Sequence, residues 1–465
     1  MARAKKEAAL TPEERLQAAL VPDWERPYKL PENWCWVRLY SLAHIISKGT
    51  TPKGGKDAYV EKGIRFLRIE NINEDGSISH ENIKHITEEM HTGFLRRSIL
   101  CKDDILISIA GTLGKTGIVG EADLPLNTNQ AISFVRLIRG NLLPQYIKMS
   151  IDNPKTQDML ISQTKVTSIP NLTLEIIGNC AIPLAPLAEQ QRIVDRIESL
   201  FAKLDEAKEK AQAVVDSFET RKAAILHKAF TGELTAKWRE EHGVGMESWK
   251  KKSVGELCIS LKYGTAKKSD ASGNVVVLRM GNLQQGEIDW SDLAYSNDPD
   301  DIEKYKLFPG DVLFNRTNSA ALVGKTAIYR GEHPAIYAGY LIKLDYDHDK
   351  IIGDYLNYAL NTLDAKKYCN SVKTDGVNQS NINAKKIGAY SFNVPSIPEQ
   401  EKTVSVIQKL LSKEQQTKEA AEIVLDQIEL MKKSILARAF RGELGTNDPS
   451  EESAVELLKE IIRRG

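Results

Sequence analysis

The chain has 465 residues, of which 42% are hydrophobic and 27% charged, and its 63 basic residues balance 63 acidic ones. This composition is that of a folded globular protein, and the length predicts two or three domains rather than a single core. A net charge of zero excludes a general polycationic coat for nucleic acid, although it permits a local basic groove. No uncharged apolar run approaches the ~20 residues of a membrane span, and no apolar signal core begins the chain, so we expect a cytoplasmic protein without membrane contact.

The N-terminal extension, residues 1–30, is expected to contain one helix. Thr11, Pro12 and Glu14 predict its start, with a capping threonine and a glutamate three residues later. From residue 31 to 186 the sequence pattern changes to short apolar runs, such as DDILISI, which are separated by Gly, Asn and Asp. Such runs are typical of strands in a mixed α/β domain.

A stretch that occurs twice organises the chain. Residues 225–234 (ILHKAFTGEL) and 435–444 (ILARAFRGEL) share seven of ten positions at an offset of 210. Gly232 and Gly442 are placed where a helix can stop in the left-handed conformation. Each copy closes an apolar seam with steps of three and four residues, from Ile193 to Ile225 in the first helix and from Val404 to Ile435 in the second. The first helix, from about residue 189 to 230, would be roughly 60 Å long.

The two seams predict an antiparallel coiled coil within one chain, since a narrow apolar stripe needs a partner. The polar stretch from Glu414 to Lys418 interrupts the second seam. Two unrelated surface helices remain the alternative, which the repeated ending disfavours.

The globular stretch after residue 246 repeats the first in order and spacing. LRIENI (67–72) corresponds to LRMGNL (278–283), DDILIS (103–108) to GDVLFN (310–315), and GKTGIV (114–119) to GKTAIY (324–329). We therefore expect a charged linker around KWREEHGVG and then a second domain of the same fold with a different surface. The last segment, SEESAVELLKEIIRRG, predicts a helix with Ser450 as its cap.

The expected domain organisation follows from these boundaries. It comprises a helical extension (1–30), domain one (31–186), a spacer helix with its linker (187–245), domain two (246–397), a second spacer helix (398–445) and a tail helix (446–465). The fold class is mixed α/β (α+β), with two globular domains separated by two long helices that form an antiparallel coiled coil.

With LPENW ahead of the first domain, PLAEQ and PEQ at the helix starts and the twin AF-x-GEL endings, nearly the whole chain resembles the specificity subunits of type I restriction-modification enzymes. The second helix start has no residues that match Leu187 and Ala188, which would shift its register. The resemblance implies two target-recognition domains that each read one half of a bipartite, gapped site in double-stranded DNA. It also implies a subunit without catalytic residues, metal or cofactor of its own.

Partners and cofactors follow from the same resemblance. It implies two methyltransferase subunits, which bind S-adenosylmethionine and methylate an adenine in each half-site. It implies two restriction and translocase subunits, on which ATP and Mg are expected. A spacer of this length would place the half-sites about one DNA turn, ~34 Å, apart.

Three other motifs favour no enzyme chemistry. GTLGKTG (111–117) lacks the glycine that a nucleotide-binding loop needs four residues before Gly-Lys, where Ile109 and, in the second copy, Ser319 stand. Lys115 and Lys325 are therefore expected in tight turns near a DNA backbone. His80, His85 and His91 have no ligand spacing and are expected on the surface. The five cysteines are scattered without a C-x-x-C pair, so we expect reduced, structural thiols.

Candidates for DNA contact form clusters on Gly-rich or polar loops. Lys and Thr suit phosphate oxygens, and Arg, Asn and Gln suit base edges. In domain one they are Lys48, Thr50, Thr51, Lys53, Arg68, Asn71, Lys115, Asn129, Gln130, Lys165 and Thr167. In domain two they are Lys262, Lys267, Lys268, Arg279, Asn282, Arg316, Asn318, Lys325, Lys373, Asn378 and Gln379. Any one of them, taken alone, fits a turn or a solvated surface better than a base contact.

The leading hypothesis is a sequence-specific DNA-binding subunit. A coiled-coil adaptor without DNA affinity is the alternative, because the basic clusters are modest. A stand-alone enzyme with a degenerate phosphate loop is disfavoured by Ile109 and Ser319.

Overall fold

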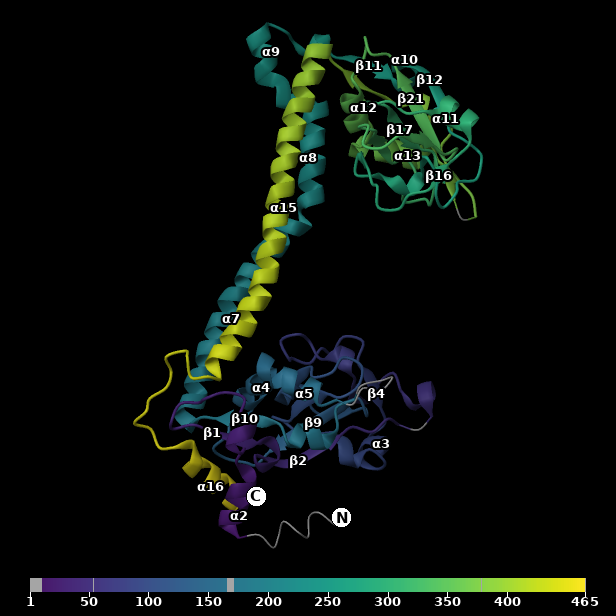
Figure 1. Ribbon diagram of the computed structural model, residues 1–465. Coiled ribbons are helices and arrows are strands. Elements are labelled where there is room, and N and C mark those ends of the chain that lie inside the picture. Colours follow the sequence, from purple (N-terminus) through teal and green to yellow (C-terminus); the bar gives the residue numbers. More distant parts are fainter. Residues whose placement is uncertain (1–10, 53, 165–170, 378, 465) are drawn as a thin grey trace. The chain divides into compact units, whose positions relative to one another are not determined.

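The computed structural model describes residues 11–52, 54–164, 171–377 and 379–464 (Figure 1). The chain forms two compact units. Unit 1 comprises residues 1–210 and 424–465, and unit 2 comprises residues 211–423. Unit 1 therefore combines the first predicted domain with the start of one long helix and the end of the other.

Unit 1 contains two four-stranded sheets and one two-stranded sheet. The first, β2-β9-β6-β7, is antiparallel throughout, and the second, β4-β3-β8-β5, contains the parallel pair β3 and β8. The strands are β1 (Cys35–Arg38), β2 (Ala43–Lys48), β3 (Ile64–Leu67), β4 (Lys84–Ile86), β5 (Ile99–Leu100), β6 (Ile105–Ser108), β7 (Thr116–Ile118), β8 (Leu126–Thr128), β9 (Ile132–Leu137) and β10 (Ala181–Leu184). The helices are α2 (Pro12–Ala19), α3 (Glu88–Thr92), α4 (Pro144–Asp152), α5 (Pro154–Ser162), α6 (Leu174–Gly178), most of α7 (Leu187–Asp216) and α16 (Ala454–Arg464).

Unit 2 repeats this plan. Its antiparallel sheet β12-β21-β17-β19 corresponds to β2-β9-β6-β7, and the parallel pair β13 and β20 corresponds to β3 and β8. The strands are β11 (Lys250–Ser253), β12 (Cys258–Tyr263), β13 (Val275–Leu278), β14 (Leu283–Gln284), β15 (Glu287–Ile288), β16 (Tyr295–Ser296), β17 (Val312–Asn315), β18 (Thr317–Asn318), β19 (Thr326–Ile328), β20 (Ala335–Tyr337), β21 (Leu341–Tyr346), β22 (Thr374–Asp375), β23 (Ser380–Asn381) and β24 (Ser391–Val394). The helices are α8 (Phe218–Phe230), α9 (Ala236–His242), α10 (Val254–Leu257), α11 (Pro299–Tyr305), α12 (Gly353–Leu360), α13 (Leu363–Val372), α14 (Ala384–Gly388) and much of α15 (Ile397–Ala439).

The predicted duplication is thus confirmed in its details. DDILIS and GDVLFN form the equivalent strands β6 and β17, and GKTGIV and GKTAIY form β7 and β19. In each unit the first and last strands of the domain pair, β1 with β10 and β11 with β24, so that both domain ends lie beside the start of a long helix.

The long helices pair antiparallel in each unit, as the seams predict. In unit 1, Lys208 of α7 donates to Glu429 of α15 at 2.8 Å, and Ile193 and Ile197 pack in the same core as Leu436. In unit 2, Leu226 of α8 packs with Ile407 of α15. Figure 1 shows α15 running beside α7 and α8.

The first long helix is not continuous, contrary to the sequence-based expectation. It is interrupted at Ser217, whose hydroxyl hydrogen-bonds the carbonyl of Ala213 in the preceding turn. A serine that bonds back in this way weakens and bends a helix. The polar stretch of α15, by contrast, leaves that helix unbroken, because Glu414 pairs with Arg221 and the Lys418 ammonium lies 5.2 Å from the Phe218 ring centre. Polar residues that are matched across a seam fix its register.

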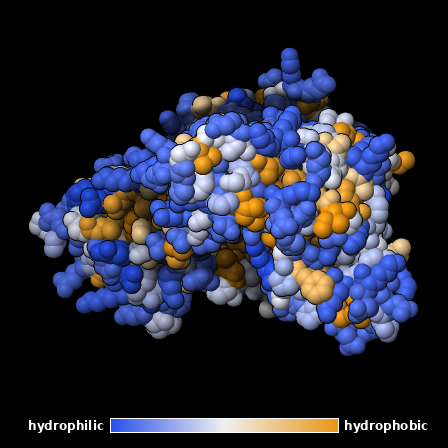
Figure 2. Space-filling view, turned by 90° about the horizontal axis from the view of Figure 1, so that it is seen from above, coloured by the Kyte–Doolittle hydropathy of each residue, from blue (hydrophilic) through white to orange (hydrophobic). Residues whose placement is uncertain are grey.

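Buried apolar residues form a main core in each unit. In unit 1 the core joins α4, β6, β9 and the starts and ends of the long helices, and in unit 2 it joins the equivalent α12, β17 and β21. On the face drawn in Figure 2, hydrophilic residues predominate and hydrophobic ones form small groups.

The glutamine of the EQ motif at each helix start has a structural role in the domain core. Gln190 accepts from the backbone of Leu143 and donates to Ala185, and Gln400 accepts from Ile352 and donates to two backbone carbonyls. Both glutamines are fully buried. Each amide therefore joins the start of a long helix to the loop ahead of α4 or α12.

The second helix start keeps the register of the first, so the expected shift is wrong. The backbone N–H of Gln190 donates to the carbonyl of Pro186, and the backbone N–H of Gln400 donates to the carbonyl of Ser396, at 2.9 Å in each case. Ile397 and Pro398 therefore occupy the places of Leu187 and Ala188.

The phenylalanine of each AF-x-GEL ending packs against a tyrosine of the equivalent helix, α4 in unit 1 or α12 in unit 2. Phe440 packs on Tyr146 with ring centres 5.3 Å apart, and Phe230 packs on Tyr355 at 4.9 Å. Gly232 and Gly442 have φ of 84° and 75°, which confirms the predicted left-handed helix stops. The end of one long helix is thus fixed beside the start of the other.

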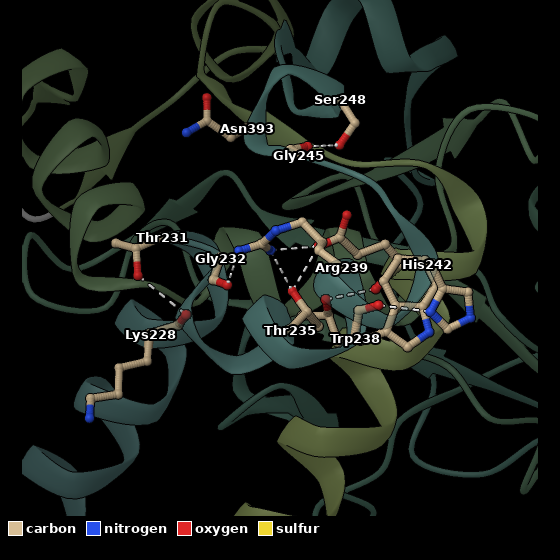
Figure 3. A network of polar contacts seen from close by, with 12 residues as sticks. Lys228, Thr231, Gly232, Thr235, Trp238, Arg239, His242, Gly245, Ser248 and Asn393 are labelled. Carbon is tan, nitrogen blue, oxygen red and sulfur yellow. Dashed lines mark hydrogen bonds and ion pairs between the residues drawn. The ribbon is translucent and has the colours of Figure 1, made fainter.

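The buried glutamates have different partners in the two units. Glu189 accepts from the Trp34 indole at 2.8 Å and from Thr446 at 3.3 Å. Glu399 accepts from Thr235 and from the Arg239 guanidinium, both at 2.7 Å, and Figure 3 shows Arg239, Thr235 and Gly232 turned toward one another.

The predicted linker around KWREEHGVG is the helix α9, which supplies this buried arginine. Trp249, the counterpart of Trp34, is left with its indole N–H unpaired among the described residues, and so is Glu399 Oε2. Arg239 therefore takes the role in unit 2 that the indole has in unit 1.

The terminal helices belong to unit 1. Thr11 and Glu14 form the predicted capping box at the start of α2. The tail helix α16 begins at Ala454, later than expected, and Ser450 is not its cap. Ser450 instead hydrogen-bonds Asp448 in a turn, and the Ser453 hydroxyl accepts from the amide of Val455 at 3.3 Å.

Replacing Arg239 by alanine would leave the Glu399 carboxylate buried without a cation. Removal of one partner from a buried ion pair costs about 3–5 kcal/mol. We expect Arg239→Ala to lower the free energy of opening of unit 2 by this amount, measured by hydrogen exchange of amides at the start of α15. Lys237→Ala on the same helix removes only an exposed pair with Glu241 and should leave the protection unchanged. Equal protection in both variants would contradict a stabilising role for the buried pair.

The pH dependence of unit 1 should reflect Glu189. Burial raises the pKa of this carboxyl above its ordinary value of 4.5. The folded chain then holds a proton that the unfolded chain has released, so this contribution to stability is present at low pH and is lost as pH rises through the folded pKa. We expect Glu189→Gln to gain stability relative to the wild type as pH rises above 4.5, measured by urea unfolding. Glu198→Gln, an exposed position on α7, is the matched control, and parallel curves for Glu189→Gln and the wild type would refute the expectation.

Candidate nucleic-acid interface

In unit 1, most of the predicted contact residues gather at one end of the two main sheets. The backbone N–H of Gly49, just after β2, donates to Ile132, and that of Ile109, just after β6, donates to Ala131. The N–H of Asn129 donates to the last residue of β3, Leu67. These contacts bring together Lys48, Thr50 and Thr51 after β2, Arg68 after β3, Lys115 beside β6, and Asn129 and Gln130 ahead of β9.

Exposure differs within this edge of unit 1. Lys48, Thr51 and Gln130 are exposed, whereas Thr50, Arg68, Lys115 and Asn129 are half-buried. Lys48 and Lys115 form no ion pair with a described residue, and Arg68 pairs with Glu70. Lys53, Lys165 and Thr167 lie outside the described residues. Within its described part, the edge thus presents the ammonium groups of Lys48 and Lys115 without a paired carboxylate.

Unit 2 builds the equivalent edge from the equivalent contacts. The N–H of Thr265 donates to Tyr337, that of Arg316 to Tyr340, and that of Ile382 to Arg316. Lys262, Lys267, Lys268, Arg279, Arg316, Asn318, Lys373 and Gln379 therefore lie on or next to this end of the sheets, and Asn378 is outside the described residues.

Aspartates neutralise most of the cations at the edge of unit 2. Lys262 pairs with Asp345 at 2.8 Å, Lys267 with Asp298 at 2.6 Å, and Arg279 with Asp292 at 3.0 Å. Lys373 lies 3.7 Å from Asp375. The hydrogen bond from Lys267 to Asp298 lowers the pKa of the Asp298 carboxyl and raises the pKa of the Lys267 ammonium. Lys268 is exposed and forms no ion pair with a described residue.

Arg316 is held in a fixed orientation at this edge. Its guanidinium lies over the Tyr263 ring, 4.7 Å from the centre, and donates to the carbonyl of Gly339 at 3.1 Å. A guanidinium fixed by a ring and a carbonyl loses little further entropy on forming a planar contact. Tyr263 was not recognised in the sequence, where the only signal was its position at the end of a strand.

Lys325 and Asn318 are used within the domain. Lys325 donates to the Gln284 side chain at 2.7 Å, and burial, together with the nearby charge of Lys366, lowers its pKa. Asn318 accepts from the amide of Ser319 at 2.8 Å. Asn318 ends β18 and Lys325 directly precedes β19, and these contacts hold both side chains within the domain.

Asn71 and Asn282 have a structural role that the sequence interpretation did not assign. Asn71 Oδ1 accepts from the N–H of Arg68 at 3.1 Å, and Asn282 Oδ1 accepts from Arg279 at 2.8 Å. Their exposed fractions are 2% and 3%, so little of either amide is available to DNA. The repeated asparagine of LRIENI and LRMGNL closes the short helical turn after β3 or β13.

The two GKT segments form turns between antiparallel strands, as expected. Ser108 receives the N–H of Lys115 on its hydroxyl, and Gly111 and Gly114 have φ of 74° and 77°. Each turn leads into a strand, whereas a nucleotide-binding loop opens a helix. The geometry of both segments therefore differs from that of a nucleotide-binding loop.

His91 corrects the expectation of three surface histidines. It is 8% exposed, its ring lies 3.2 Å from the amide nitrogen of Asn127, and burial lowers its pKa. His80 hydrogen-bonds Asp123 at 2.7 Å.

Among the residues that the structure describes, no group of three or more His, Cys, Asp or Glu is placed to hold a metal ion. All five cysteines are free thiols, and no described helix is long and apolar enough to cross a membrane.

Known proteins share this architecture. The chain matches the family model described as type I restriction modification DNA specificity domain twice, over residues 31–215 and 246–424. The chain therefore belongs to this family and carries two copies of its domain.

Similar proteins match the chain over nearly its full length. The type I restriction enzyme StySPI specificity subunit of Salmonella potsdam is 24% identical, covering 93% of this chain and 96% of that protein. The EcoKI specificity subunit of Escherichia coli K12 is 25% identical with the same coverage. The HsdS subunit from Thermoanaerobacter tengcongensis aligns with a TM-score of 0.59 at 20% identity, over 90% of this chain and 100% of that one. A chain from a study of complex assembly and conformational transition of the type I R-M system aligns with a TM-score of 0.68 at 19% identity and the same coverage. The fold is therefore that of the specificity subunits.

Lys48 and Lys115, which form no ion pair with a described residue, should contribute directly to DNA affinity. Each phosphate contact that is lost lowers the slope of log affinity against log salt concentration by about 0.9. We expect Lys48→Ala and Lys115→Ala each to reduce the slope by about one and to weaken binding to all sequences alike, measured by titration at several salt concentrations. Lys102→Ala, at the opposite end of β6 and paired with Glu121, is the control. An unchanged slope in both variants would remove these lysines from the interface.

Proposed function

We propose that this chain is the specificity subunit of a type I restriction-modification enzyme, in which units 1 and 2 each read one half of a bipartite, gapped site in double-stranded DNA. The observation that carries the proposal is the repeated edge. Both units place Lys, Arg and amide side chains at the same end of equivalent sheets, while the residues themselves differ. A shared scaffold with two different edges suits two different half-sites.

The edges combine the two kinds of group that DNA recognition needs. Lysine and hydroxyl groups such as Lys48 and Thr51 bind phosphate oxygens and orient the domain. Planar groups such as Arg316 and Gln130 can form paired hydrogen bonds with base edges in the major groove. Base reading by particular side chains is part of the proposal.

The partners are methyltransferase subunits and restriction and translocase subunits, two of each. The long helices support this, since they carry exposed charged residues, such as Glu198 on α7, that could contact a partner subunit. S-adenosylmethionine, ATP and Mg would bind to those partners, and this chain would hold no catalytic residue. A protein that marks and restricts genomic DNA is expected to act in the cytoplasm.

An adaptor without DNA affinity is the second candidate, favoured by the lysine–aspartate pairs at the edge of unit 2. Retention of the full chain on duplex DNA at low salt and its release at high salt would exclude the adaptor.

The domain assignment is tested by exchange. The chain is co-expressed with its methyltransferase subunit, and methylated adenines are sequenced across the host genome. We expect a gapped motif, one half of which changes when residues 31–186 are replaced by the same region of a relative. The other half should change when residues 246–397 are replaced. A stable complex that methylates without such a motif would show that the chain is a docking scaffold.

A further inference from the structure

The hairpin of β22 and β23 in unit 2 ends in an unusually exposed apolar residue. Thr374 pairs with Asn381 and Asp375 with Ser380, and the N–H of Gly376 donates to Gln379 at 2.8 Å to close the turn. Val377 lies in this turn and is fully exposed, more so than any other large hydrophobic residue in the described part of the chain. An exposed valine at a tip gains nothing from the fold itself.

The base of the hairpin is fixed to the edge of unit 2. β23 pairs with β18 as well as with β22, and Asn381 donates to the Thr317 hydroxyl at 2.8 Å. The next residue, Ile382, is buried and donates its N–H to Arg316. The hairpin therefore projects from a rigid support that also carries Arg316.

Three lysines and one aspartate lie at the base of the hairpin, where Lys373 is 3.7 Å from Asp375. Lys386 donates to the Thr374 hydroxyl at 2.7 Å, and Lys373 donates to the carbonyl of Ala320 at 3.2 Å. Lys385 is exposed on the same short helix, α14. An apolar tip on a base that carries more lysines than aspartates suits a duplex, in which phosphates flank a groove that contains base edges.

We propose that the β22–β23 hairpin enters the major groove of the half-site read by unit 2 and that Val377 contacts the C5-methyl group of a thymine there. The major groove, about 12 Å wide, admits a two-stranded ribbon and presents the thymine methyl, whereas the minor groove, about 6 Å wide, does neither. Val377 is then a specificity-determining residue. The inference rests on the proposed function and adds to it one contact residue, Val377, and the base that it recognises, a thymine.

The test uses the complex of the full chain with its methyltransferase subunit. Once the motif is known from methylation, duplexes are prepared in which each thymine of the unit 2 half-site is replaced in turn by deoxyuridine, which lacks only the methyl group. We expect wild-type affinity to fall about fourfold at one position, since each buried methyl contributes by its apolar area. Val377→Ala should weaken binding to the unmodified duplex about tenfold and should be insensitive to deoxyuridine at that position.

Ile259→Ala is the matched control, because Ile259 is an exposed apolar residue at the other end of β12 from Lys262. It should retain wild-type affinity and sensitivity to deoxyuridine. Equal weakening by Val377→Ala on every duplex, no deoxyuridine effect at any thymine, or a unit 2 half-site of G·C pairs only would each overturn the inference. None of these outcomes affects the proposed function, which fails only if domain exchange leaves the motif unchanged or no motif exists.

Discussion

The buried Glu-Gln pair at the start of each long helix is the contact on which the rest of the structure depends. A carboxylate that is removed from water must find hydrogen bonds, and the partners of Glu189 and Glu399 come from segments far away in the sequence. Trp34 or Arg239 belongs to the entry of a domain, and Thr446 or Thr235 follows the end of the opposite long helix. One side chain therefore joins a helix start, the segment after a helix end and the entry of a domain, and it adds to the apolar seams that pair α7 and α8 with α15.

The two units use chemically different side chains at equivalent positions of α4 and α12, close to the candidate DNA-binding edges. In unit 1, Lys148 donates to the carbonyl of Asp75 at 3.1 Å, and Asp152 accepts from the Thr116 hydroxyl. In unit 2, Asn357 donates to the carbonyl of Gly286 at 2.8 Å, and Asn361 donates to the carbonyl of Thr326 at 3.1 Å. Lys148 and Asp152 also pair with each other at 3.0 Å, so an ion pair in unit 1 and two amides in unit 2 perform one task, which is to hold a turn against the helix α4 or α12. Because the geometry is conserved while the chemistry changes, the edge above can diverge without loss of the fold.

The sequence could predict what is periodic or repeated, and the structure added what depends on distant partners. The seams, the left-handed glycines and the capping box at Thr11 are local signals, and they predict the helices and their ends, although not the interruption at Ser217. The helical nature of KWREEHGVG was missed because its decisive contact, Arg239 with Glu399, joins residues 160 positions apart. Ser450 was chosen as a cap because several Ser and Glu residues fit that role, and only the docking of α16 selects Ser453. The candidate DNA contacts were found as clusters, but burial of Asn71 and Asn282 could not be seen without the turns that enclose them.

The two edges differ in a way that matters for a protein of zero net charge. A DNA backbone that approaches unit 2 meets Asp292, Asp298 and Asp345 beside the cations, so repulsion opposes any phosphate that is not placed directly on a lysine or arginine. In unit 1, Lys48 and Lys115 have no such partner among the described residues, and the attraction of a lysine to phosphates does not depend on the DNA sequence. On the proposed function, this division assigns the first encounter with DNA mainly to unit 1 and leaves unit 2 to penalise misplaced backbones. A balance of 63 positive and 63 negative residues is therefore compatible with DNA binding through a local group of cations.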